Sequence, residues 1–415
     1  MTITDPDAAD ASWLPIADAR RTMLDAVRPV TGWESIPLSD ALGRVLDRDV
    51  VAPFDVPAHD NCAMDGYALR AADLAPAGGT RLTVVGTALA GKAFSGSVGA
   101  GQAVRVMTGA VLPPGADLVV PQESTHAEGD TVEFPAGARV GQNVRRAGED
   151  LARGQAALRA GRRIGPADLG LLASLGIAEV AVRRRIRVAI VSTGDEIASI
   201  GRALGPGEIY DSNRYTLTAA LRRLDVELLD LGVVRDDPVA LDHAFRNAAE
   251  AADAVITSGG VSVGEADFVK QLMTRLGAVH FWKIAIKPGR PMAFGRIGNA
   301  WLFGLPGNPV AVMVSFYQLV IDVLHRLAGV DPLPVRPLLT APCVAPIRKG
   351  KGRTEFLRAL LFDDGDGWKV KPGAQQGSGV LRSIAEANCF IVLPEDQGNV
   401  AAGEAVQVQL FDGLL

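Results

Sequence analysis

A glycine-rich segment followed by acidic side chains has the residue types needed to bind an anion together with a metal ion. Residues 254–257 predict a short buried strand, because β-branched residues run without polar interruption up to a glycine pair. Residues 258–264 can turn tightly, and residues 265–276 have helical spacing of apolar side chains. This order places backbone N–H groups at a helix start, where anions bind. Because Glu265 and Asp267 follow the turn in place of a basic residue, we expect a phosphate-bearing ligand held partly through a metal ion.

Two common phosphate-binding motifs are excluded at this segment. A dinucleotide fingerprint requires glycine at its third position, which Val261 occupies. A P-loop requires Lys and then Ser or Thr after its second glycine, where this chain has Glu265 and Ala266. The remaining alternative is an ordinary helix start, in which Ser262 and Glu265 form a capping box.

Two more loops that follow predicted strands carry carboxylates. Residues 192–197 (STGDEI) contain Asp195 and Glu196, and the alternative there is a capping box of Thr193 with Glu196. Residues 235–238 contain Asp236, and the alternative is a cap for the helix that follows.

The fourth loop, residues 302–309 (LFGLPGNP), has glycines that suit a backbone anion site. Asn308 is expected as a helix N-cap, with Pro309 at the first helical position. Because ligands bind outside the carboxyl ends of parallel strands, we expect the four loops to form one cleft.

Lys283 and Lys287 lie four residues apart on a predicted strand. Even spacing would place both ammonium groups on one strand face, with Ile284 and Ile286 on the other. A lysine pair facing a carboxylate-rich cleft is consistent with an oxyanion bound beside a metal-bound phosphate. The alternative is a solvated strand face.

The elements that must position these loops alternate regularly from Arg187 onward. Expected strands cover residues 188–191, 226–234, 254–257, 278–286 and 300–303, and expected helices residues 214–224, 238–252, 265–276 and 309–327. Repeated βα units of this length predict an α/β fold with a doubly wound, largely parallel sheet and helices on both faces.

The rest of the chain has a different pattern of apolar and turn-forming residues. Helical spacing is expected at residues 15–27, 39–46 and 165–175, while residues 52–145 and, after a proline-rich linker, residues 338–415 read as β-rich. The last of these regions predicts a small β-barrel or sandwich. A length of 415 residues suggests about three domains.

Composition limits the class of protein. A net charge of −5 with dispersed basic residues argues against nucleic acid as the main partner. Cys62, Cys343 and Cys389 have no metal or redox spacing, which favours a reducing cytosol. The N-terminus lacks a signal pattern, and the most apolar stretch, residues 310–321, is interrupted by Gln318 and too short to span a bilayer. We therefore expect a soluble cytoplasmic protein with no membrane contact.

Several long motifs in a fixed order carry a family resemblance. They are DNCAMDGYAL (60–69), MTGAVLPPGAD (107–117), NVRRAGEDL (143–151), STGDEI (192–197), TSGGVSVGEADF (257–268), WKIAIKPGRPMAFG (282–295), GLPGNPV (304–310) and NCFIVLP (388–394). Together they make the chain similar to the molybdopterin molybdenumtransferases, that is, to bacterial MoeA and the C-terminal domain of gephyrin. Two departures are Cys62, where a serine is usual, and Arg290, where a lysine is usual; the arginine keeps the charge but not the shape.

The resemblance implies the last step of molybdenum cofactor assembly. Adenylylated molybdopterin would be hydrolysed with a divalent metal, usually Mg2+, and molybdate would be inserted into the dithiolene, releasing AMP. It also implies an elongated homodimer, with an active cleft between the α/β domain of one subunit and the β-rich domain of the other. Other cofactor-assembly proteins and recipient molybdoenzymes are expected partners. The implied domains are an elongated helical N-terminal domain (10–51 and 146–183), an inserted β-rich domain (52–145), an α/β molybdopterin-binding domain (184–332) and a C-terminal β-barrel (333–415).

Residue roles also follow from the resemblance. The partner subunit would contribute Asp65 and Thr108. The metal, the nucleotide or the attacking water would be positioned by Glu196, Asp236 and Asp267. The pyrophosphate would lie against Ser258, Gly259, Gly260 and Ser262. Molybdate would be held by Lys283, Lys287, Pro288, Arg358 and Ser378, with Ser383 as an alternative in the last domain. Competing functions are an adenylyltransferase acting one step earlier and a gephyrin-like scaffold without catalysis.

Overall fold

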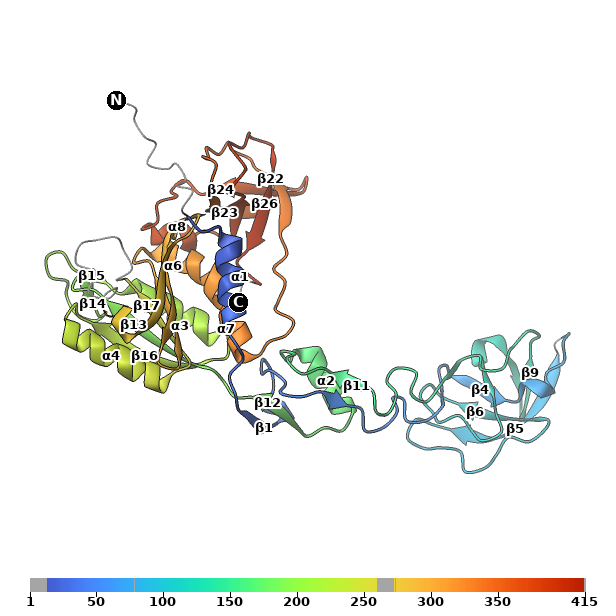
Figure 1. Cartoon of the computed structure of the whole chain (residues 1–415). Coiled ribbons are helices and arrows are strands. Elements are labelled where there is room, and N and C mark those ends of the chain that lie inside the picture. The colour runs from blue at the N-terminus through green and yellow to red at the C-terminus, as the bar shows by residue number, and fades with distance from the viewer. Residues whose placement is uncertain (1–12, 78, 260–271, 273, 414–415) are drawn as a thin grey trace.

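The structure is a computed structural model that describes residues 13–77, 79–259, 272 and 274–413 (Figure 1). An α/β part and a C-terminal β part lie against each other at one end of the molecule. A narrow connecting part leads from them to a separate β-rich lobe at the other end. The molecule is therefore elongated, and the lobe is remote from the α/β sheet.

The α/β part is built on one six-stranded sheet in the order β16-β13-β17-β21-β20-β18. Its strands are β13 (Arg187–Thr193), β16 (Glu227–Val234), β17 (Ala254–Ser258), β18 (Gly277–Lys283), β20 (Pro291–Ile297) and β21 (Ala300–Leu305). The first four strands in the spatial order are parallel, whereas β20 and β18 are antiparallel additions. The strand expected over 278–286 ends at Lys283, and sequence reasoning missed β20 altogether.

Helices cover both faces of this sheet, because its strands bury side chains on each side. They are α1 (Ile16–Ala26), α3 (Ser212–Arg222), α4 (Pro238–Ala251), α6 (Pro309–Ser315) and α7 (Ile321–Ala328). Along β13, Val188 and Ile190 join the apolar cluster that contains α1, α3, α6 and α7. Ala189 and Val191 join the cluster that contains α4. This alternation gives the doubly wound α/β architecture that the βα pattern predicts.

Helices α6 and α7 form one continuous helix through a π-helical turn, η4 (Phe316–Val320). Pro309–Ala328 has 20 residues and is the one helix among the described residues that is long and apolar enough to cross a membrane. The expectation that this stretch is too short was wrong. Its most apolar window is 83% buried inside the protein, as in the core helix of a soluble fold.

Helix α1 belongs to the core of the α/β part, although the sequence grouped it with the N-terminal segment. Its apolar stripe buries Ala19 and Met23 in the same cluster as α7. The preceding residue Leu14 pairs with the chain after β18, where its N–H donates to the Lys283 carbonyl (2.8 Å) and its carbonyl accepts from the Ala285 N–H (2.8 Å).

The connecting part consists of two strand pairs and one helix. Its elements are β1 (Trp33–Pro37) with β12 (Glu179–Arg183), β2 (Val50–Val51) with β11 (Ala156–Leu158), the short η1 (Leu38–Asp40) and α2 (Pro166–Ser174). The helix expected over 39–46 was wrong, since only the 3-10 turn η1 forms there. Helix α2 lies where helical spacing predicted it.

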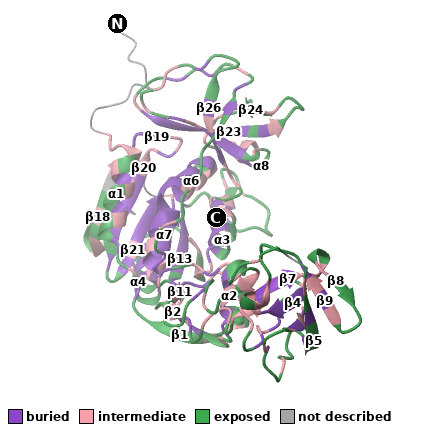
Figure 2. Ribbon diagram, turned by 90° about the vertical axis from the view of Figure 1, so that its right-hand side faces the viewer, coloured by how far each residue is buried: buried purple, intermediate pink, exposed green. Residues whose placement is uncertain are grey.

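The β-rich lobe carries its own six-stranded sheet, in the order β7-β4-β6-β5-β9-β8, and a pair β3-β10. The bounds are β3 (Asn61–Cys62), β4 (Gly66–Leu69), β5 (Thr80–Ala88), β6 (Gln102–Val106), β7 (Leu118–Pro121), β8 (His126–Glu128), β9 (Thr131–Phe134) and β10 (Val144–Arg145), with short turns η2 (Ala71–Asp73) and η3 (Gln122–Ser124). Figure 2 shows a buried core in this lobe separate from that of the α/β part. Cys62 packs in that core, where burial raises its pKa to about 11.

The C-terminal part is built on a sheet in the order β19-β23-β25-β26-β22, with β24 beside β23. Its elements are β19 (Ile286–Lys287), β22 (Leu339–Pro342), β23 (Thr354–Asp363), β24 (Trp368–Pro372), β25 (Cys389–Leu393), β26 (Ala405–Leu410) and a short helix α8 (Leu381–Ala385). Strand β19 comes from the loop after β18 and pairs in parallel with β23. The two parts therefore share backbone hydrogen bonds at the segment that carries Lys287.

Candidate active site

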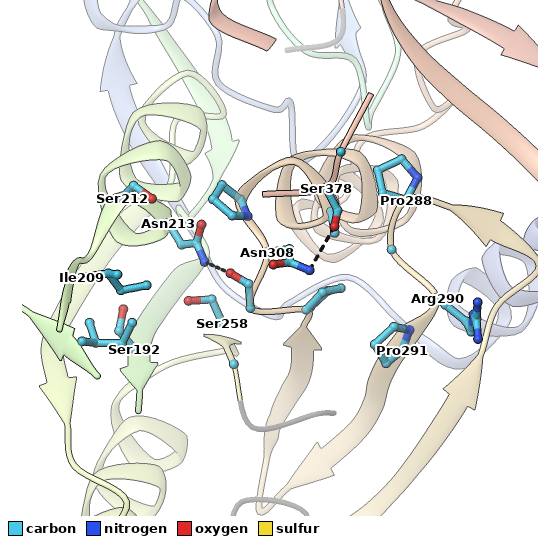
Figure 3. A pocket seen from close by; sticks show the side chains of 18 of the residues that line it. Ser192, Ile209, Ser212, Asn213, Ser258, Pro288, Arg290, Pro291, Asn308 and Ser378 are labelled. Atoms are coloured by element: carbon cyan, nitrogen blue, oxygen red, sulfur yellow. Dashed lines mark hydrogen bonds between the residues drawn. The ribbon is translucent and has the colours of Figure 1, made fainter. Parts of the chain in front are cut away.

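A cavity of about 890 Å³ lies at the carboxyl ends of the parallel strands, between the α/β part and the C-terminal part (Figure 3). Loops after β13, β17, β18 and β21 line it, together with the start of α3 and two segments of the C-terminal part. Of the predicted site residues, it brings together Glu196, Ser258, Gly259, Lys283, Lys287, Pro288 and Ser378. Three of the four loops expected at this edge of the sheet therefore meet at one cavity, those after β13, β17 and β21. The roles of these residues in ligand binding stay predictions.

The loop after β13 places the Glu196 carboxylate at the cavity. Gly194 has φ +139°, a backbone conformation that residues with a side chain rarely adopt, so the loop favours glycine there. The capping-box alternative was wrong, because the chain continues into a short strand, β14 (Ile197–Ala198), paired with β15 (Ile209–Tyr210). Glu196 is exposed and therefore accessible to a ligand.

The loop after β16 brings Asp236 beside the first loop but not into the cavity wall. Its N–H donates to Asp195 Oδ1 at 3.2 Å. The next residue, Asp237, caps α4, since its Oδ2 accepts from the Ala240 N–H at 2.7 Å. The helix-cap alternative for this loop is thus confirmed for Asp237, which leaves Asp236 at the edge of the sheet.

The glycine loop is described only at its beginning. Ser258 and Gly259 line the cavity, and Gly259 has φ +95° with the Thr193 carbonyl 2.9 Å from where a Cβ would lie. The remaining predicted residues of this loop lie outside the described residues; they are Gly260, Ser262, Glu265 and Asp267.

Lys283 and Lys287 both line the cavity, but the expectation that they share one strand face was wrong. Lys283 ends β18, whereas Lys287 lies on β19 in the other sheet. Lys287 Nζ is 3.5 Å from Oε1 of Glu355, a side chain with 6% exposure on β23. The two ammonium groups thus reach the cavity from two different sheets.

The loop after β21 joins the two parts of the chain at the cavity. Asn308 and Pro309 stand at the N-cap and first helical positions of α6, as predicted. However, the Asn308 side chain makes no capping bond, and its Nδ2 donates to Ser378 Oγ at 3.0 Å (Figure 3). The Val310 N–H donates to the Ser378 carbonyl at 3.0 Å. The C-terminal part therefore caps α6, and this contact fixes Ser378 at the cavity.

Arg358 is not among the residues that line this cavity. Its side chain is buried behind the wall, where Nη2 donates to the carbonyls of Gln375 (3.1 Å) and Gly377 (3.0 Å), and Nε donates to Ser383 Oγ (3.1 Å). Burial lowers its pKa to about 10. Arg358 therefore holds the segment that precedes Ser378.

Asp65 and Thr108 lie in the β-rich lobe, remote from the cavity of the same chain (Figure 1). Asp65 Oδ1 accepts from both the Oγ1 and the N–H of Thr108, each at 2.7 Å. These bonds lower the pKa of Asp65 and favour its anionic form, and Asp65 is half-buried while Thr108 is exposed. The fold of one chain does not bring this pair to the other predicted residues.

Two basic residues of the cavity wall, Arg290 and Arg353, were missed as site residues. Arg290 lies in the PGRP segment next to the predicted Pro288, so adjacency was an available signal. Arg353 follows a glycine at a strand start, and no spacing rule marks it. A third residue, Asn213 at the start of α3, lines the cavity and donates from Nδ2 to the Gly307 carbonyl at 2.7 Å. The cavity is thus lined by a carboxylate, Glu196, by amide groups of Asn213 and Asn308, and by four basic residues.

An open α/β sheet with a cavity at the carboxyl ends of its strands has the arrangement of a ligand-binding α/β domain, and the basic residues of the cavity wall favour an anion. The chain belongs to the MoeA family of molybdopterin molybdenumtransferases. Three family models match in order: the MoeA N-terminal region (domain I and II) over residues 14–176, a probable molybdopterin binding domain over 189–326, and the MoeA C-terminal region (domain IV) over 340–411.

Individual relatives agree with this assignment over the full length. The chain is 43% identical to a molybdopterin molybdenumtransferase of Haemophilus influenzae, covering 97% of this chain and 100% of the relative. It is 40% identical to molybdopterin molybdenumtransferase 2 of Mycobacterium tuberculosis, covering 93% and 96%. A solved molybdopterin biosynthesis MoeA protein from Pyrococcus horikoshii OT3 superposes with a TM-score of 0.83 at 30% identity, covering 96% of this chain and 100% of that one.

Proposed function

We propose that this chain is a molybdopterin molybdenumtransferase that hydrolyses adenylylated molybdopterin and inserts molybdate into its dithiolene. Water would cleave the phosphoanhydride bond, so that AMP leaves and the pterin keeps the other phosphate. Molybdate would bond to the two dithiol sulfurs and lose one oxygen as water. The observation that carries this proposal is one cavity lined by Glu196 together with Lys283, Lys287, Arg290 and Arg353, in a chain of this family.

The carboxylate side of the cavity suits a Mg2+ ion. The described residues contain no group of three His, Cys, Asp or Glu side chains able to hold a metal by themselves. Mg2+ does not need such a group, because it usually keeps several waters and binds one or two carboxylates plus substrate phosphates. Glu196 and Asp236 would supply the carboxylates, and Asp267 is proposed as a third. When bound, the ion would neutralise charge on the phosphates during hydrolysis.

The residues of the other side would bind and orient the anions. Ser258 and Gly259 would contact the pyrophosphate, together with Gly260 and Ser262. Lys283 and Lys287 would attract molybdate, with Pro288 and Ser378 closing the site around it. Arg358 would act by holding residues 375–377, and hence Ser378, in place.

A homodimer would complete the site. Asp65 and Thr108 form an exposed hydrogen-bonded pair on the lobe, and a second copy could bring that pair to the cavity of the first. The chain's location in the cytoplasm and its transfer of product to recipient molybdoenzymes stay predictions from composition and resemblance.

The test is a single-turnover assay on the purified full-length protein with adenylylated molybdopterin, Mg2+ and molybdate. AMP release and reconstitution of a cofactor-free molybdoenzyme are measured for wild type, Glu196→Gln and Asp242→Asn. Glu196→Gln removes the charge at the cavity, so we expect AMP release to fall by about 100-fold. Asp242→Asn removes a half-buried carboxylate that pairs with Arg246 and Arg275 outside the cavity, so we expect activity close to wild type.

The outcomes separate this function from its competitors. Binding of the adenylylated substrate without AMP release would indicate a scaffold. Formation of adenylylated molybdopterin from molybdopterin and ATP, without molybdate insertion, would indicate the preceding step of the pathway.

A further inference from the structure

Two arginines of the cavity wall contact the same tryptophan, Trp13, at the start of the described chain. The Cζ atom of Arg290 is 4.3 Å from the centre of the Trp13 ring, and that of Arg353 is 5.6 Å from it. A guanidinium within about 6 Å of an indole is attracted by the ring and stacks on it. Both arginines line the cavity, whereas Trp13 is not among the residues that line it.

The backbone around this tryptophan is fixed by hydrogen bonds between three segments. Leu14 bonds the chain on both sides of Ile284, and the Ile284 N–H donates to the Arg290 carbonyl at 2.8 Å. The Thr354 N–H, next to Arg353, donates to the Ala285 carbonyl at 3.0 Å. The backbone next to Trp13, Arg290 and Arg353 thus belongs to one hydrogen-bond network, and α1 begins three residues after the tryptophan.

The charge of this wall calls for an anion. Lys283 and Lys287 line the same cavity, so four basic residues surround one space, and of these Lys287 is paired with Glu355. Arginine presents a planar fork that matches the oxygens of phosphate and related oxyanions, provided that the fork is held in one orientation.

We propose that Arg290 and Arg353 form a subsite for a tetrahedral oxyanion and that Trp13 is the residue that positions both guanidinium groups. The oxyanion is either a phosphate of the adenylylated substrate or molybdate, and to that extent the inference rests on the proposed function. It also gives a physical reason for arginine at position 290. A lysine would keep the charge, but its ammonium would not stack as a plane on Trp13.

The test titrates the full-length protein separately with molybdate and with AMP by calorimetry. The variants are Trp13→Ala, Trp13→Phe and Arg290→Lys. Trp33→Ala is the matched control, because Arg48 lies 4.2 Å from the Trp33 ring in the connecting part, away from the cavity. Thermal melting identifies any variant that loses its fold, and Arg290→Lys preserves the net charge of the cavity.

We expect Trp13→Ala and Arg290→Lys to weaken binding of at least one titrant by about tenfold, the order of a desolvated cation–π contact. Trp13→Phe keeps an aromatic face and should recover most of the affinity, while Trp33→Ala should match wild type. If molybdate is the ligand, Trp13→Ala raises KM for molybdate more than it lowers kcat. If the ligand is the phosphate, only AMP binding and KM for the adenylylated substrate change.

Three results would overturn the inference. If Trp13→Ala and Arg290→Lys bind both titrants with wild-type affinity, the subsite proposal is refuted and the proposed function is unaffected. Equal losses of affinity in Trp13→Ala and Trp33→Ala would refute the subsite proposal in the same way. A wild-type protein that binds neither molybdate nor AMP would refute the proposed function together with the subsite.

Discussion

Two arginines that lie close together in the sequence take different positions at the cavity. Arg353 directly precedes β23, whereas Arg358 is the fifth residue of that strand. Arg353 lines the cavity, while Arg358 is buried and donates to the carbonyls of Gln375 and Gly377. The resemblance selected Arg358, since the sequence alone does not show which of the two arginines meets the α/β part. Glu196 and Lys283 were found from sequence, because carboxylates and lysines next to strand ends carry a recognisable signal.

His325 on α7 is a residue whose charge the fold suppresses. It is 7% exposed, and neither ring nitrogen has a hydrogen-bond partner among the described residues. Burial, followed by the charges of Arg163 and Arg336, lowers its pKa from 6.5 to about 4. In the unfolded chain His325 binds its proton near pH 6.5, and in the folded chain it does so only near pH 4. Its contribution to stability is therefore complete above pH 6.5 and is lost as the pH falls toward 4, by up to about 3 kcal/mol.

The prediction is that His325→Leu reduces the acid sensitivity of the protein. The drop in Tm between pH 7 and pH 4.5 should be smaller in this variant than in wild type. His126→Gln, which changes an exposed histidine on β8, should leave the drop unchanged. An equal drop in His325→Leu and wild type would show that His325 is not a group that controls acid unfolding.

At the scale of elements, the βα pattern predicted the parallel strands and helices, and failed where the chain changes sheets. The six residues from Trp282 to Lys287 read as one alternating strand, yet β18 ends at Lys283 and β19 joins the C-terminal sheet. Pairing between segments far apart in the sequence decides which sheet each strand joins, and a local alternating pattern carries no information about that pairing. Strand β20 was missed for the same reason, since its antiparallel partners β18 and β21 supply the hydrogen bonds.

Two helices that start near the cavity are capped in different ways. The residue before α4 caps that helix, whereas α6 is capped by a distant segment of the C-terminal part. Asp237 caps α4 through the Ala240 N–H, so Asp237→Ala should cost about 1 kcal/mol of stability. The Asn308 side chain makes no capping bond in α6, so Asn308→Ala should lower the free energy of unfolding in urea by less than Asp237→Ala does.

The two variants should also differ in ligand binding. Because Asn308 holds Ser378, Asn308→Ala should weaken molybdate binding, whereas Asp237→Ala should not. A larger stability loss in Asn308→Ala would contradict this division of roles.

At the scale of the whole molecule, the elongated shape separates residues that the family resemblance assigns to one site. The sequence indicated a β-rich segment between parts of an N-terminal unit, and the structure has this lobe at the end of two strand pairs (Figure 1). What the sequence could not give is the distance between the lobe and the cavity. That distance depends on how the short strands of the connecting part stack, and each of these pairs is only a few residues long.

The separation leads to a prediction about mixed assemblies. If the lobe of one copy completes the cavity of another, Asp65→Ala and Glu196→Gln each inactivate every site of their own homodimer. In a mixed dimer, one site takes an intact cavity from the Asp65→Ala chain and an intact lobe from the Glu196→Gln chain. Unfolding and refolding the two inactive variants together should therefore restore part of the AMP-release activity. The control mixes two variants of the same surface, Asp65→Ala with Thr108→Ala, which cannot complement each other. Recovery in the control, or no recovery in the first mixture despite dimer formation, would mean that each chain completes its own site or that Asp65 is not part of it.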